Sequence, residues 1–348
     1  MKKILVTDFL GVEAHRTMNV DLIDSLAMNY EVSVLNINGY FTPDCQHFDK
    51  NNIKVINCNC RTQGESAYSI RLFSIAAMKI TGLETRKVDY DAVISLAFDT
   101  VAMAFGIRYL KGAPLFVYHH KNIDELTNKM KKIFFNTYKK KIFHIVFENF
   151  FKNHLIKDRQ VAANRIVVIP HPIMDIKEIG CKINYDCVGL CNSNSEEFID
   201  EMCSVFLKDK SRRILLRSKS NKTSTNSVEI ISGFLEASVY YRYINESSMV
   251  LVPVPESYKY RLSGSIYDAL SRRKVVLTTS SYYAESYSQL YPGTCVYVSS
   301  AKDVQKVLDK NTYNEQQLKD SFDLFIKDHK KENIAVIMHT EINKVLEE

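Results

Sequence analysis

Short apolar runs alternate with segments of helical periodicity along nearly the whole chain. A first series of apolar runs lies at residues 3–9, 31–37, 53–57, 91–96, 114–118, 143–147 and 165–169. A second series lies at residues 187–190, 213–216, 228–231, 249–252, 275–277 and 295–298. Short apolar runs between helices are typical of buried parallel strands, which form doubly wound sheets. The pattern predicts an α/β protein with two Rossmann-like domains.

A polar stretch separates the two series of strands. Pro170, His171 and Pro172 interrupt the alternation, and polar residues continue to about residue 185. Prolines cannot continue a helix or a central strand, so this stretch marks a domain boundary. The predicted parts are a first domain at 1–173, a linker at 174–185, a second domain at 186–328 and a C-terminal helix at 329–348.

Composition limits the kind of protein that this chain can be. It has 348 residues, of which 46% are hydrophobic and 25% charged, as in soluble proteins with two well-formed cores. No apolar run approaches the length of a membrane span, and the first strand, at Lys3, leaves no room for a signal peptide. The eight cysteines lack the spacing of a disulfide framework or a zinc site. We therefore expect free thiols and a cytoplasmic protein.

The segment 253–279 combines the end of a strand, a loop, a helix and a further strand. Ser263 and Gly264 stand where the helix begins, so free backbone N–H groups and the positive end of the helix dipole are exposed there. Arg261 adds a fixed charge, which suits a phosphate or diphosphate, and Asp268 is placed to accept hydrogen bonds from ribose hydroxyls. The alternative is that Arg261 is a solvated loop charge and Ser263 an ordinary helix cap.

This segment resembles the donor-binding segment of GT-B glycosyltransferases, close to the large family-four group. The matching letters are Asp268-Ala269-Leu270, followed by Val275-Val276-Leu277. The stretch 168–173 is similar to the strand that precedes the interdomain linker in that family. The resemblance implies two domains that face a cleft, the first on the acceptor side and the second binding a nucleotide-sugar. It also implies that the C-terminal helix crosses back onto the first domain.

The resemblance also assigns roles to residues of the second domain. It gives Asp268 the ribose contact, the amides of Ser263 and Gly264 the diphosphate contact, and the turn at Gly233 and Phe234 the nucleobase contact. Tyr258 and Tyr260 join the candidate donor-binding residues, although Tyr260 replaces the glutamate that the family carries.

The family's Arg–Lys pair after the first strand of this domain is absent from residues 189–197. Arg261, alone or with Arg217, is the hypothesised replacement. Arg217 and Lys219 follow the second strand of the domain, where they either pair with phosphates or are solvated.

The first domain supplies the candidate catalytic residues. Gly11 and His15 follow its first strand, in a loop that the resemblance places near the diphosphate, and His119 and His120 end a later strand. A histidine at such a place can orient a sugar hydroxyl, stabilise the leaving phosphate or act as a general base. The alternative is that these histidines only support the fold.

No divalent metal site is expected. The only Asp-x-Asp pair, at residues 89–91, precedes a strand and so lies at the wrong end of the sheet for a ligand site. A mechanism based on the helix dipole and an arginine fits better, with a UDP- or GDP-sugar as cosubstrate and no metal or other cofactor. The resemblance implies retention of anomeric configuration.

The basic segment 121–141 interleaves lysines with Ile133, Phe134, Phe135 and Tyr138. Such a helix either lies on an anionic membrane surface or is an ordinary solvated helix. No nucleic-acid-binding motif accompanies the basic residues, so nucleic acid is not an expected partner. We expect a glycan or lipid-linked glycan acceptor, in surface polysaccharide or glycoconjugate assembly, with possible attachment to the inner face of the membrane.

Three other functions share parts of this pattern. A nucleotide-sugar epimerase has the same two-domain plan but needs paired carboxylates in the cleft. A nicotinamide-dependent oxidoreductase needs Gly-x-Gly-x-x-Gly after the first strand, and residues 8–15 lack it. A periplasmic-type binding protein has two such lobes but requires export.

Overall fold

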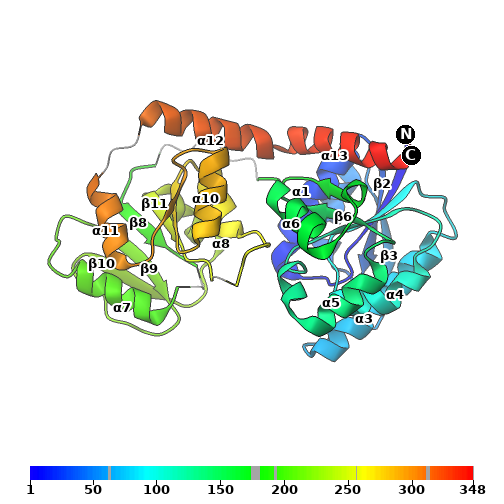
Figure 1. Ribbon diagram of the computed structural model, residues 1–348, viewed down its shortest axis with the longest axis horizontal. Coiled ribbons are helices and arrows are strands. Elements are labelled where there is room, and N and C mark those ends of the chain that lie inside the picture. The colour runs from blue at the N-terminus through cyan, green and yellow to red at the C-terminus, as the bar shows by residue number, and fades with distance from the viewer. Residues whose placement is uncertain (62–63, 174–180, 192–193, 256, 311–313, 348) are drawn as a thin grey trace. The chain divides into compact units, whose positions relative to one another are not determined.

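A computed structural model describes residues 1–347 apart from 62–63, 174–180, 192–193, 256 and 311–313 (Figure 1). The chain divides into two compact units. The first unit contains Met1–Pro172, Tyr260–Leu262 and His329–Glu348, and the second contains Ile173–Lys259 and Ser263–Asp328. Of the predicted linker, residues 174–180 lie outside the described part, so the linker boundaries stay a prediction.

The first unit is built on a seven-stranded parallel sheet in the order β3-β2-β1-β4-β5-β6-β7. Its strands are β1 Lys3–Thr7, β2 Glu31–Ile37, β3 Lys54–Cys58, β4 Ala92–Ser95, β5 Leu115–Tyr118, β6 Phe143–Val146 and β7 Ile166–Val168. Its helices are α1 Arg16–Ala27, α2 Cys45–Lys50, α3 Ala67–Glu84, α4 Thr100–Gly106, α5 Lys129–Tyr138, α6 Asn149–Arg159 and α13 Lys331–Leu346. The predicted doubly wound sheet is confirmed. The short helix α2 was not predicted, because its six residues hold one buried apolar side chain, Phe48.

The second unit is built on a six-stranded parallel sheet in the order β10-β9-β8-β11-β12-β13. Its strands are β8 Tyr185–Gly189, β9 Ile214–Ser218, β10 Val228–Ser232, β11 Ser247–Val252, β12 Val275–Thr278 and β13 Cys295–Tyr297. Its helices are α7 Glu196–Val205, α8 Ala237–Asn245, α9 Gly264–Ser271, α10 Ser281–Leu290, α11 Ala301–Lys310 and α12 Glu315–His329. This second doubly wound sheet is confirmed as well.

The central strands are apolar on both faces because helices cover both faces of each sheet. In β1, Ile4, Leu5 and Val6 are fully buried, and in β11 Val250 and Leu251 are buried although they point to opposite faces. Burial of successive residues is characteristic of a parallel strand inside an α/β unit. The continuous apolar runs in the sequence therefore belong to central strands that are buried on both faces, not to strands with one solvent-exposed face.

The strand order of the second unit creates a reversal of direction next to β8. The chain moves from β8 outward to β9 and β10, and then returns to pair β11 on the other side of β8. Loops after β8 and β11 therefore leave the sheet toward opposite sides at its carboxyl edge. Such a switch point opens a crevice for ligands in doubly wound sheets.

The C-terminal helix α13 packs on α1 within the first unit, as the resemblance implied (Figure 1). Ile334, Met338 and Ile342 on one face of α13 are at most 1% exposed and belong to the core of this unit. The Lys331 ammonium lies 2.6 Å from the Asp21 carboxylate of α1. The last helix is therefore part of the first unit's core.

Replacing Met338 by alanine should lower the free energy of unfolding by about 2–5 kcal/mol, because a fully buried side chain leaves a cavity. Urea denaturation followed by circular dichroism measures this change. Val336→Ala on the same helix, where the side chain is 61% exposed, is the control and should change it by less than about 0.5 kcal/mol. Equal effects of both substitutions would show that α13 does not pack in this way.

Candidate functional site

The start of α9 lies at the carboxyl edge of the second unit's sheet. The helix begins at Gly264, as predicted, and Ser263 is its N-cap residue in extended conformation. The Ser263 side chain does not make the capping hydrogen bond that the sequence suggested. A Cβ added at Gly264 would meet no described atom within 4 Å. The first N–H groups of α9 therefore border open space, as an anion-binding helix start requires.

Asp268 lies one turn further along α9 and is surrounded by aromatic residues of α8. Burial raises the pKa of its carboxyl group to about 6, against the opposing effects of Arg272 and the hydroxyls of Tyr240 and Tyr241. The Arg272 guanidinium is 3.9 Å from the carboxylate and 4.0 Å from the centre of the Tyr241 ring. The Asp268 side chain keeps 26% of its surface exposed. It is therefore a fixed, partly desolvated carboxylate with one accessible side.

The predicted nucleobase-contact turn at Gly233 and Phe234 lies beside Arg217, a predicted phosphate partner, at the ends of β9 and β10. Arg217 Nε donates a hydrogen bond to the Gly233 carbonyl oxygen at 2.8 Å. Gly233 has φ of +86°, a left-handed conformation that favours glycine. Phe234 follows with 82% of its surface exposed. The structure thus brings Arg217, Gly233 and Phe234 together and leaves an aromatic ring open to a ligand.

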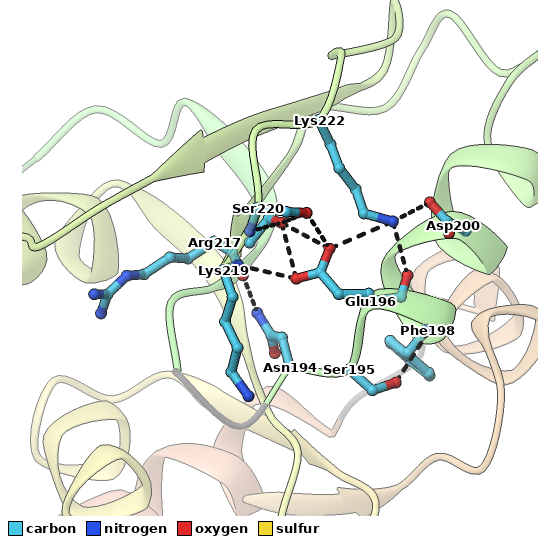
Figure 2. A network of polar contacts seen from close by, with 10 residues as sticks. Asn194, Ser195, Glu196, Phe198, Asp200, Arg217, Lys219, Ser220 and Lys222 are labelled. Carbon is cyan, nitrogen blue, oxygen red and sulfur yellow. Dashed lines mark hydrogen bonds and ion pairs between the residues drawn. The ribbon is translucent and has the colours of Figure 1, made fainter.

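A carboxylate network fixes the loop that follows β9 (Figure 2). Glu196, in the first turn of α7, accepts hydrogen bonds from the Ser218 and Ser220 hydroxyls and from the Lys219 backbone N–H at 2.8–3.0 Å. Its carboxylate also lies 3.4 Å from the Lys222 ammonium. These hydrogen bonds lower the pKa of Glu196 to about 2, and those from the Ser220 hydroxyl and the Lys219 N–H have the largest effects. Glu196 therefore stays ionised and holds residues 218–222 in place.

Asn194 ties the ends of two neighbouring strands together beside this network. Its side-chain amide donates to the Gly189 carbonyl oxygen at 2.8 Å and to the Arg217 carbonyl oxygen at 3.0 Å. The side chains of Arg217 and Lys219 point away from the Glu196 carboxylate (Figure 2). Among the described residues neither cation has an ion-pair partner within 4.0 Å. The end of β9 and the loop after it thus present two positive charges at the sheet edge.

Tyr260 and Arg261 belong to the first unit, although they lie in the loop before α9. Arg261 Nε donates to the Asp124 carboxylate at 2.9 Å, and the same carboxylate accepts the Tyr260 backbone N–H at 2.8 Å. The Tyr260 ring stacks on His154, with ring centres 3.8 Å apart. Tyr260 and Arg261 thus contact residues of the first unit, whereas Ser263, Gly264 and Asp268 belong to the second unit. Tyr258, also in the second unit, lies in a turn closed by its N–H and the Pro255 carbonyl.

Two of the three candidate catalytic histidines lie together at the carboxyl edge of the first unit's sheet. The rings of His15 and His120 stack with centres 4.4 Å apart. His120 Nε2 donates to the Leu96 carbonyl oxygen at the end of β4, at 2.7 Å. Burial lowers the pKa of His120 to about 3, and burial followed by Lys121 lowers that of His15. Both rings are therefore neutral near pH 7, and His120 Nδ1 carries a lone pair.

His119 points into the core instead. Its side chain is fully buried, its Nε2 is 2.8 Å from His144 Nδ1, and its ring packs edge-on against Phe98. Neighbouring residues at a strand end point to opposite faces of the sheet, which separates His119 from His120. In this environment His119 contributes to the packing of the core.

Asp8 holds the loop that contains Gly11. Its carboxylate accepts the backbone N–H groups of Leu10 and Gly11 at 2.7 and 2.8 Å, and the Asn19 amide at 2.9 Å. Burial raises the pKa of Asp8 to about 6. Gly11 has φ of +59°, which the tight turn requires. The loop leading to His15 is therefore fixed by a buried carboxyl group.

No metal centre is evident in the part of the chain that the structure describes, where no three side chains of His, Cys, Asp or Glu gather closely enough to hold an ion. The eight cysteines are free thiols.

Acid should destabilise the chain, because burial lowers the pKa of His120 to about 3 and those of His144, His171 and His329 to about 4. In the unfolded chain these groups titrate near 6.5, so the unfolded state binds more protons as the pH falls. The free energy of unfolding should decrease between pH 6.5 and 4. Asp8 and Asp268, whose pKa values are raised, oppose this trend.

His329 offers a matched test, because its Nδ1–H donates to the His171 carbonyl oxygen at 2.7 Å and an asparagine amide can replace that donor. His329→Asn should reduce the slope of the free energy of unfolding against pH by up to about 1.4 kcal/mol per unit. Urea denaturation at several pH values measures the slope. An unchanged slope would show that His329 is protonated equally in both states.

Arg261→Ala should lower the free energy of unfolding by about 1–3 kcal/mol, because it leaves the Asp124 carboxylate, 4% exposed, without this donor. In a cycle with Asp124→Asn, measured by urea denaturation, the second substitution should cost less once the first is present. Additive effects would show that the ion pair does not form in solution.

No protein-family model and no curated protein sequence matches the chain. Solved structures match it over nearly its whole length. Sucrose-phosphate synthase from Thermosynechococcus elongatus has a TM-score of 0.68 at 11% identity, with both chains covered completely. Anabaena HepE in complex with UDP has a TM-score of 0.63 at 12% identity, again with complete coverage. The UDP-GlcNAc 2-epimerase from Neisseria meningitidis has a TM-score of 0.63 at 12% identity, covering 99% of this chain and 100% of that one.

Proposed function

Because the chain has the GT-B fold, we propose that it is a glycosyltransferase that moves a sugar from a nucleotide-diphosphate sugar to a glycan or lipid-linked acceptor. The observation that carries the proposal is the open start of α9 at Gly264 with the Asp268 carboxylate one turn away. These two features bind the two polar parts of a nucleoside diphosphate. Surface polysaccharide or glycoconjugate assembly is the process proposed for it.

The donor's diphosphate binds at the first turn of α9. Unpaired N–H groups and the positive end of the helix dipole stabilise negative charge there, and Gly264 lets phosphate oxygens approach the backbone. Asp268 then accepts hydrogen bonds from the two ribose hydroxyls, which a carboxylate with one accessible side can do at once. The exposed ring of Phe234 offers a surface for the nucleobase.

Lys219 and Arg217 supply positive charge as the diphosphate leaves. Arg217 stands at the end of β9, and Lys219 follows it on a loop that Glu196 holds in place. A charge that is already in position stabilises the departing diphosphate without reorganisation, which favours its departure. This arrangement replaces the Arg–Lys pair missing after β8 and supports a metal-independent mechanism.

His15 and His120 contact the transferred sugar or the acceptor. Both are neutral near pH 7, and His120 donates from Nε2 to Leu96, so that its Nδ1 can accept a hydrogen bond from a hydroxyl group. We assign this pair to orienting a sugar hydroxyl in a reaction that retains anomeric configuration. Two solved structures of HepE contain UDP and UDP-glucose, which supports a uridine donor.

Asp268→Asn should weaken binding of the preferred nucleoside diphosphate about tenfold or more, because charge-assisted hydrogen bonds to ribose are lost. Isothermal titration measures the affinity. The substitution should not lower the melting temperature, because burial disfavours the ionised carboxylate in the folded state. Asp320→Asn, on the exposed surface of α12, is the control and should bind like the parent. Unchanged affinity in Asp268→Asn would remove Asp268 from the donor site.

An epimerase of the same fold is the second candidate, because the Neisseria meningitidis epimerase matches the chain with the same TM-score as HepE, 0.63. Proton NMR of the UDP-sugar with the protein and no acceptor separates the two functions. A glycosyltransferase leaves the sugar unchanged or releases UDP and free sugar. An altered sugar that is still attached to UDP would identify an epimerase and contradict the proposal.

A further inference from the structure

Helix α5 of the first unit presents two different strips on its outer side. Successive residues of a helix are rotated by about 100°, so Met130, Ile133 and Phe134 lie on one strip and Lys129, Lys132 and Asn136 on the adjacent one; Lys140 follows the end of the helix. Phe135 and Tyr138 lie on the opposite side and are at most 1% exposed. The apolar strip is therefore additional to the face that packs on the core.

The apolar strip continues onto the neighbouring helix α4, which lies beside α5 (Figure 1). Phe105 of α4 contacts Phe134, with ring centres 5.5 Å apart. Met130, Ile133 and Phe105 are 59%, 57% and 49% exposed. Three large apolar side chains exposed side by side mark an interaction surface rather than chance exposure.

The basic strip borders a hollow between α5 and the end of α6. The hollow has a volume of about 460 Å³ and is lined by Lys132, Asn136, Lys139, Lys140, Asp158, Arg159 and Gln160. Burial lowers the pKa of the Lys139 ammonium group, and repulsion from the Lys140 and Lys132 ammonium groups lowers it further. The single carboxylate of this set, Asp158, lies 2.7 Å from His154 Nδ1. An anion in the hollow would relieve the repulsion.

The Arg159 guanidinium adds a positive charge to the lining of this hollow. The Arg159 carbonyl oxygen accepts the Lys139 ammonium at 2.8 Å. A phosphate group, with its negative charge and several acceptor oxygens, matches the cations that line the hollow.

We propose that this surface of α5 and α4 docks on a bilayer that contains anionic lipids. A headgroup phosphate occupies the basic hollow, while Ile133, Met130 and Phe105 enter the boundary between headgroups and acyl chains. A helix with adjacent apolar and lysine-rich strips binds an anionic membrane surface through burial of its apolar side chains and through electrostatic attraction of its lysines. In the described part of the chain no helix is long and apolar enough to cross the bilayer. The inference does not rest on the proposed enzymatic function.

The absence of tryptophan from the chain allows a direct test. Ile133→Trp places a single tryptophan on the apolar strip, and Val336→Trp places one on the exposed face of α13 as the matched control. With vesicles of phosphatidylcholine and phosphatidylglycerol, emission of the first variant should shift to shorter wavelength and that of the control should not. Vesicles of phosphatidylcholine alone should give a smaller shift. No shift with the anionic vesicles would overturn the proposal.

The basic hollow is tested by vesicle sedimentation of the full chain. Lys132→Ala with Lys140→Ala should weaken binding to the anionic vesicles about fivefold for each lysine. Lys208→Ala with Lys302→Ala, which removes two exposed lysines of the second unit, should bind like the parent. Equal binding by both double variants would contradict the proposal. So would a rise in melting temperature with inorganic phosphate but no binding to the anionic vesicles, because the hollow would then serve soluble anions.

Discussion

The parallel pairing of β8 with both β9 and β11 is the constraint on which the second unit's candidate site depends. It sends the loops after β8 and β11 to opposite sides of the sheet and leaves the carboxyl edge open between them. The N-terminus of α9 and the Glu196 network are both placed at that edge. Asn194 then joins the ends of β8 and β9 through two backbone carbonyl groups. The strand order determines where a ligand can bind, and the side chains at that edge determine which ligand it is.

Strand and helix positions could be predicted from the sequence because they depend on local periodicity. The run at β2 was predicted with its observed bounds, and α9 begins at the predicted Gly264. The alternation of side chains along a strand was also available in the sequence. It implies that His119 and His120 face opposite sides of the sheet, and the structure places only His120 beside His15.

The contacts that the sequence did not reveal join residues far apart in the chain. Arg261 and Asp124 are separated by 137 positions, and Glu196 binds a loop more than 20 positions away. The aromatic surroundings of Asp268 come from α8, which no local pattern connects to α9. The periodicity of apolar residues along the chain does not indicate which distant residues contact one another. The basic segment 121–141, in contrast, did indicate a surface with lysines beside apolar residues, and the structure specifies which of them are exposed.

Nucleotide binding by the unmodified chain tests the central claim most directly. The melting temperature would be measured with UDP, GDP, ADP, dTDP, CMP and NAD, each with and without a chelator, because a ligand that binds only the folded state raises it. The donor site proposed here predicts a rise with a nucleoside diphosphate, UDP or GDP, that the chelator does not change. A rise with NAD alone, or no rise with any diphosphate, would contradict it.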